Sequence, residues 1–99
     1  MPGYVAILSV ELHFPEAGSL KAKRSHLLSA KAQLQNRFGA SVAEVAHHEL
    51  WQRAGLTIAC VARDARGAEE LAAAAERWLS AQDWVLVSSE LTLVSPDDD

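Results

Sequence analysis

The sequence lacks most of the features that reveal a function or a location. It has one cysteine among 99 residues, which excludes a disulfide within the chain. Cys60 lies in the apolar run 56–61, so we expect a small buried hydrophobic residue and not a nucleophile or a metal ligand. The apolar run at residues 4–10 is too short to cross a membrane, and Glu11 follows it. We therefore expect a cytoplasmic protein with no membrane partner.

Motifs for catalysis are also missing. No glycine-rich phosphate loop follows an expected strand, no serine stands in a nucleophile elbow, and no close carboxylate pair suggests a general acid and base. His47 and His48 are adjacent, but neighbouring strand residues point to opposite faces, so their imidazoles do not easily share an ion. We expect no metal, no cofactor and no enzymatic activity. A pocket with polar groups converging on His48, Glu49 and Arg53 would revive the enzyme hypothesis.

Acidic residues are absent between Glu16 and Glu44. The formal net charge of −4 hides this asymmetry, because three of the negative charges belong to Asp97–Asp99. Positive charge is therefore concentrated in one segment of a nearly neutral body. Its five basic residues are Lys21, Lys23, Arg24, Lys31 and Arg37.

Ser19 precedes an apolar helical periodicity and is expected to cap the N-terminus of a helix. Basic residues in the first turns oppose the helix dipole, at a cost of about 0.3–1 kcal/mol each. Unpaired backbone N–H groups and a basic cluster can together bind phosphate or another anion. The alternative is that these charges are solvated near Glu16 or Glu44 of the folded chain, or that they lie along the edge of the sheet. The anion-binding or RNA-binding candidates are Ser19, Lys21, Lys23, Arg24 and Lys31.

The chain predicts six regular elements in the order strand, helix, strand, strand, helix, strand. Pro15 ends the first strand, and Gly39 follows the last periodic residue of the first helix. Asp64 is expected to cap the second helix, whose buried face would be Ala68, Leu71, Ala75, Trp78 and Leu79. The strands are expected at 4–14, 41–49, 55–61 and 84–94, and the first helix at 20–38.

This order is the split βαβ pattern of an α+β, ferredoxin-like βαββαβ two-layer sandwich. We expect an antiparallel sheet of order 4-1-3-2 with both helices on one face, in a single domain at 1–95 followed by a disordered acidic tail at 96–99. Apolar residues on both sides of the first strand indicate an open face for a homo-oligomer or a protein partner, although scattered surface hydrophobes would give the same pattern. In the last strand, one face is expected to hold Val85, Val87, Leu91 and Leu93.

The connection between the second and third strands contains a tryptophan, which must either fold over the core or contact a partner. The third strand has no aromatic residue, so RNA recognition by base stacking on the sheet is disfavoured, and helix-mediated phosphate contact remains. The partner-contact candidates are His48, Glu49, Trp51, Gln52 and Arg53.

Three segments, Ser-Leu-Lys-Ala-Lys-Arg at 19–24, Ser-Val-Ala-Glu-Val at 41–45 and Leu-Trp-Gln-Arg-Ala at 50–54, together resemble the YlxP-like family, domain of unknown function 503. The resemblance covers nearly the whole chain and implies a βαββαβ fold in a small bacterial protein. Family members are often encoded beside translation and ribosome-maturation factors, including ribosome-binding factor A, which implies a role near the ribosome but no activity. Glu49 stands where the family commonly has Asp. The family's recurring residues correspond to Lys21, Lys23, Arg24, Glu44, Trp51 and Gln52.

The leading hypothesis is a non-catalytic binding module that contacts ribosomal RNA or a ribosome-associated protein through the basic helix start and the hairpin. No DNA partner is expected. The competing hypothesis is a homodimeric scaffold or small-ligand-binding domain that uses the open sheet face.

Overall fold

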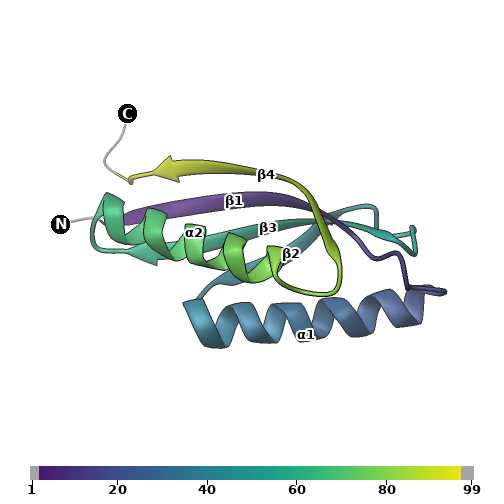
Figure 1. Ribbon diagram of the computed structural model, residues 1–99. Helices are drawn as coiled ribbons and strands as arrows, with labels where there is room; N and C mark the ends of the chain where they lie inside the picture. The colour runs from purple at the N-terminus through teal and green to yellow at the C-terminus, as the bar shows by residue number, and fades with distance from the viewer. Residues whose placement is uncertain (1–2, 97–99) are drawn as a thin grey trace.

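The computed structural model of the chain describes residues 3–96 and confirms the ferredoxin-like α+β fold. The two helices lie on the same side of the sheet (Figure 1). Residues 97–99 of the predicted acidic tail lie outside the described residues. The elements are β1 (Tyr4–His13), α1 (Leu20–Phe38), β2 (Ser41–Ala46), β3 (Arg53–Ala62), α2 (Ala65–Ser80) and β4 (Val85–Val94).

Local capping sets the limits of both helices. At the start of α1, the Ala22 N–H donates to Ser19 Oγ at 3.0 Å, and at its end Gly39 adopts a left-handed conformation with φ of 62°. At the start of α2, the Gly67 N–H donates to Asp64 Oδ1 at 2.7 Å. A Cβ at Gly67 would lie 2.8 Å from the same oxygen, so glycine leaves room for the cap. Both predicted N-caps are confirmed.

The sheet has the strand order β2-β3-β1-β4, which is the predicted order counted from the other edge. The central strand β1 pairs antiparallel with β3 from Tyr4 opposite Ala62 to His13 opposite Arg53. It also pairs antiparallel with β4, starting at Val5 opposite Val94. The helices therefore cover a continuous antiparallel sheet whose other face is open.

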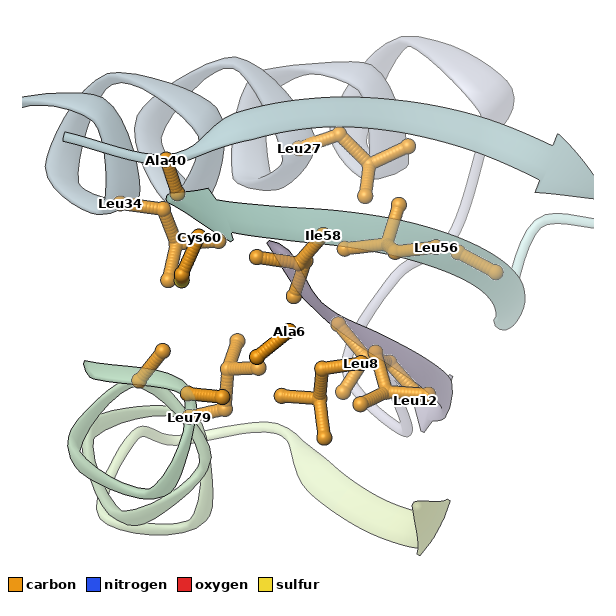
Figure 2. Packing of buried hydrophobic residues seen from close by; sticks show 14 of the residues in the cluster. Ala6, Leu8, Leu12, Leu27, Leu34, Ala40, Leu56, Ile58, Cys60 and Leu79 are labelled. Carbon is orange, nitrogen blue, oxygen red and sulfur yellow. The ribbon is translucent and has the colours of Figure 1, made fainter. Parts of the chain in front are cut away.

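The core lies between the helices and one face of the sheet (Figure 2). Alternate residues of β1 are buried there, as the sequence pattern predicted. In α2 the fully buried positions are Ala68, Ala72, Ala75 and Leu79, while Leu71 and Trp78 are only partly buried at the margin. Small side chains let this helix approach the sheet closely. Burial raises the pKa of the Cys60 thiol by desolvation, as suits a small core residue.

A β-bulge in the pairing of β1 with β4 corrects the face predicted for the last strand. Glu11 lies opposite Ser88, but the next residue of β1, Leu12, lies opposite Leu86, so Val87 is the extra residue. The side-chain alternation of β4 changes phase at this point. Leu86 and Leu93 both pack against the core, whereas Val85 and Val87 are about half exposed.

The β2–β3 hairpin has a longer connection than the sequence predicted. β2 ends at Ala46 instead of at residue 49, because His47 adopts a left-handed conformation with φ of 64°. A second bulge lies between Glu44 and Ala46. A Cβ at Gly55 would lie 2.9 Å from Ala46 Cβ, so a glycine opposite the bulge allows the two strands to approach.

Candidate functional site

Lys23 is the most deeply buried basic residue of the candidate anion site. Its side chain is 1% exposed, and its Nζ lies 3.1 Å from Glu44 Oε2. The same ammonium donates to the carbonyl oxygens of His47 at 2.7 Å and of Arg53 at 2.9 Å. Two of its three hydrogens therefore have carbonyl acceptors on the β2–β3 hairpin, and Glu44 supplies the opposite charge without a hydrogen bond to Oε2 among the described residues.

Through these contacts Lys23 attaches α1 to the hairpin. Its ammonium group does not make the anion contact that we expected. A buried cation requires a counter-charge and hydrogen bonds, and Glu44 with the two carbonyls supplies both. Ser19, another of the candidates, uses its Oγ to cap α1. Neither side chain leaves its polar group available in the way the sequence suggested.

The other three candidates form a row on the surface of α1, which we call the basic stripe and define as Lys21, Arg24 and Lys31. Lys21 and Arg24 are exposed and Lys31 is half-buried. No carboxylate within residues 3–96 forms an ion pair with any of the three. Arg24 and Lys31 line a groove between α1 and β2, together with Leu27, Leu28 and Glu44. The sequence asymmetry therefore survives as an exposed cationic surface on one flank of α1.

Gln52 joins the hairpin to the connection between β1 and α1. Its side-chain Nε2 donates to the backbone carbonyls of Pro15 at 3.2 Å and Ala17 at 3.3 Å. Its backbone carbonyl accepts from the Phe14 N–H at 2.8 Å. Together with Lys23, these contacts hold the hairpin against the start of α1 from both sides.

The tip of the hairpin carries the remaining partner-contact candidates. Trp51 is 54% exposed and does not fold over the core, which was one of the two alternatives for it. Glu49 is exposed, and His48 Nε2 lies 3.1 Å from the Glu44 carbonyl. Glu49 and Arg53 line one shallow groove at this tip, together with Leu50, Trp51 and Gln52. The groove is mainly apolar, His48 is not among its lining residues, and the Arg53 guanidinium lies 3.4 Å from Glu11 Oε1.

A cluster that the sequence did not reveal links β1 to the hairpin. His47 Nε2 lies 2.6 Å from Glu11 Oε1, and Arg53 Nη2 lies 3.4 Å from the same oxygen. A Cβ at Gly55 would lie 3.2 Å from Glu11 Oε2, so the glycine also makes room for this carboxylate. The cluster stabilises the left-handed turn at His47. Within residues 3–96 there is no group of three His, Cys, Asp or Glu side chains that could hold a metal ion.

The other flank of α1 borders a groove that the sequence analysis missed. Ring contacts join Phe14, His26, Trp84 and Trp78 along it, and the polar side chains of Ser29, Gln33 and Arg37 follow. His26, Ser29, Gln33 and Arg37 follow one another at a spacing of three or four residues, so the sequence alone places these four side chains on one face of the helix. The other rings are Phe14, twelve positions before His26, and Trp78 and Trp84, more than forty positions after Arg37, and only the fold brings them close.

Comparison with known proteins gives a family match over most of the chain. The profile of the family described as "Protein of unknown function (DUF503)" matches residues 5–90. The chain belongs to the DUF503 family. The YlxP-like resemblance inferred from three short segments is thereby confirmed, and the matched range includes both flanks of α1 and the β2–β3 hairpin.

Two further similarities accompany the DUF503 match. "Uncharacterized protein YlxP" of Bacillus subtilis (strain 168) is 41% identical over 46 residues, which cover 46% of this chain and 50% of that protein. The chain thus spans about half the length of the curated relative it matches. A solved structure, "De novo designed protein Foldit4", is similar at a TM-score of 0.45 and 13% identity, over 98% of this chain and 99% of that one. In the described part of this DUF503 chain, no helix has the length and apolar character needed to cross a membrane.

Proposed function

We propose that this DUF503 chain is a non-catalytic RNA-binding module that contacts the phosphate backbone through the basic stripe. The observation that carries the proposal is a 19-residue helix without an acidic residue, whose Lys21, Arg24 and Lys31 have no ion-pair partner within residues 3–96. Lysine and arginine on one helical flank can replace the counterions of several phosphates at once.

The spacing of the stripe suits an extended polyanion better than a single small anion. Lys21 and Lys31 are ten residues apart, which corresponds to about 15 Å along the helix axis. Three cations over that length meet consecutive phosphates and not one phosphate group. Ribosomal RNA is one such target, and it would place the protein in the cytoplasm.

The open sheet face offers a poorer surface for RNA. Its central positions carry small or polar side chains such as Ser9, Thr57 and Ala59, and none of the strand residues on that face is Phe, Tyr or Trp. Base stacking on a sheet requires aromatic rings at such positions. The proposal therefore assigns RNA contact to α1.

The test is a titration of a structured RNA hairpin with the full chain at several salt concentrations. Three phosphate contacts predict that log K falls with log salt at a slope of about −2 to −3. The variant Lys21→Glu/Arg24→Glu/Lys31→Glu should lose at least about tenfold in affinity at low salt. A matched control with the same change in net charge is Arg63→Glu/Arg66→Glu/Arg77→Glu, whose residues are exposed elsewhere.

Three results would count against RNA contact through the stripe: binding that is insensitive to salt, equal losses in both triple variants, or no binding at all. Recovery on ribosomal particles that survives ribonuclease treatment would identify a ribosome-associated protein as the partner in place of RNA.

A second candidate function is supported by a row of valines across the open face. Val5 lies opposite Val61 in β3 and opposite Val94 in β4, so three β-branched side chains stand side by side. Val61 is 66% exposed and Val94 is 40% exposed. We propose this row, with Ile7 beside it, as the contact of a homodimer. Sedimentation should then detect a concentration-dependent dimer that Val61→Lys or Ile7→Lys abolishes, and a monomer at all concentrations would reject it.

A further inference from the structure

A groove runs along the flank of α1 that faces away from the basic stripe. One half is lined by Phe14, Glu16, Asp83 and Trp84, and the other by Gln33, Arg37, Trp78 and Gln82. His26, Asp83 and Trp84 line both halves, so the two are continuous. The first half is mainly aromatic and the second mainly polar.

The aromatic half presents a ring to solvent. The imidazole of His26 stacks on Phe14 with centroids 5.6 Å apart and an interplanar angle of 15°. His26 is nevertheless exposed, and Trp84 lies edge-on to its ring at a centroid distance of 6.4 Å, so the exposed part of the imidazole is where a planar ligand would stack. Trp84 packs edge-on against Phe14 at 5.6 Å, and its buried Nε1 has no acceptor within residues 3–96. Ring contacts with Phe14, His26 and Trp78 hold the indole.

The polar half presents an oriented cation. Arg37 Nε donates to Gln33 Oε1 at 2.9 Å, and the guanidinium carbon lies 6.0 Å from the centroid of Trp78. These two contacts occupy Nε and one side of the guanidinium, and its terminal nitrogens have no acceptor among the described residues. Two parallel N–H groups in a fixed fork match the oxygens of a phosphate.

We propose that this groove binds one nucleotide unit, with the base against His26 in the aromatic half and the phosphate at Arg37. The charges of the groove set this direction. Glu16 lines only the aromatic half, where its carboxylate repels a phosphate, and Arg37 lines only the polar half. Asp83 lines both halves and, with Glu16, can accept hydrogen bonds from a base that carries N–H donors. Guanine suits this end best, because its ring N–H and its amino group are adjacent donors. Phosphate and base therefore prefer opposite ends of the groove.

The site is independent of the basic stripe, because the two sets of residues occupy opposite flanks of α1 and share no side chain. A nucleotide in the groove can be a free mononucleotide or an unpaired nucleotide of a larger RNA. Both present the same base and phosphate, and the experiment separates them by comparing free GMP with RNA.

The experiment is calorimetric titration of the full chain with GMP, guanosine, ribose 5-phosphate and inorganic phosphate. We expect saturable GMP binding, weaker guanosine binding and little binding of the last two. Arg37→Gln should weaken GMP binding about tenfold while leaving guanosine unchanged, since it removes only the phosphate contact. Asp83→Asn should weaken GMP and guanosine alike. Because guanosine binding reports on an intact groove, a misfolded Arg37→Gln variant would be recognised by its loss of both ligands, and Arg37→Lys would then replace it.

The control is Arg24→Gln, which changes the same charge on the opposite flank and should leave GMP binding unaltered. An RNA hairpin with an unpaired guanosine that competes with GMP, when a fully paired duplex does not, would identify an RNA nucleotide as the occupant. Competition by neither RNA would identify a free nucleotide. The proposal is overturned by absence of GMP saturation up to about 1 mM, by equal effects of Arg37→Gln and Arg24→Gln, or by preference for a cationic amine over GMP.

Discussion

The two flanks of α1 hold their basic side chains in different ways. The flank toward β2 carries Arg24 and Lys31 without ion-pair partners within residues 3–96, whereas the flank toward the α2–β4 connection carries Arg37, held by Gln33 and Trp78. Cations that are loosely held suit a polyanion of variable geometry. A cation that is fixed beside aromatic rings suits one ligand in one orientation. How a charge is held, and not its presence, distinguishes the two surfaces.

The largest expected effect is on stability and concerns Lys23, which lies on the buried face of α1 between the two flanks. Lys23→Ala should lower the free energy of unfolding by about 3–5 kcal/mol, because it leaves the Glu44 carboxylate without its counter-charge and two carbonyls without their donor. Lys21→Ala, two residues away and exposed, should change it by less than about 0.5 kcal/mol. Urea denaturation of both variants measures the difference. Similar midpoints would mean that Lys23 is not the fastening point of the hairpin.

An intermediate effect is expected on ligand affinity when RNA and GMP are each tested with variants of both flanks. Lys21→Glu/Arg24→Glu/Lys31→Glu should lower the affinity for a fully paired RNA at least about tenfold and leave GMP binding unchanged. Arg37→Gln should do the reverse. Measurement of both ligands with both variants gives a two-by-two comparison. If each variant weakened both ligands equally, the two flanks would have to be treated as one electrostatic surface.

The smallest effect is expected at Leu28, which is 69% exposed between Arg24 and Lys31. Leu28→Lys adds one charge to the basic stripe, so RNA affinity at low salt should rise about twofold to fivefold and the salt dependence should steepen by nearly one unit. Stability should change by less than about 0.5 kcal/mol. Leu28→Gln, which removes the apolar side chain without adding charge, is the control. If Leu28→Gln also raised the RNA affinity, the cause would be the changed solvation at the apolar side chain and not the added charge.

Much of the fold could be predicted because its signals are local. Ser19 and Asp64 at the helix starts and Gly39 at a helix end act within one turn, and each lies where the sequence placed it. The strand order followed from the order of the elements. The bulge at Val87 was missed because the alternation of β4 alone shows no break, and only its pairing with β1 reveals the extra residue.

The candidate site was less predictable, because side-chain partners come from distant elements. The sequence grouped Lys23 with Lys21 and Arg24 by charge, although the helical period places it beside the apolar residues that face the core. Its partner Glu44 and the carbonyls of His47 and Arg53 belong to the hairpin. The nucleotide groove depends likewise on Trp84 meeting His26 across 58 positions of the chain.

The attachment of the hairpin has a consequence for Trp51 at its tip. Lys23 and Gln52 each bind the hairpin to the start of α1 by hydrogen bonds, so the exposed indole stands on a hairpin that is held at both sides. A protein that captured this indole would lose little conformational freedom in doing so.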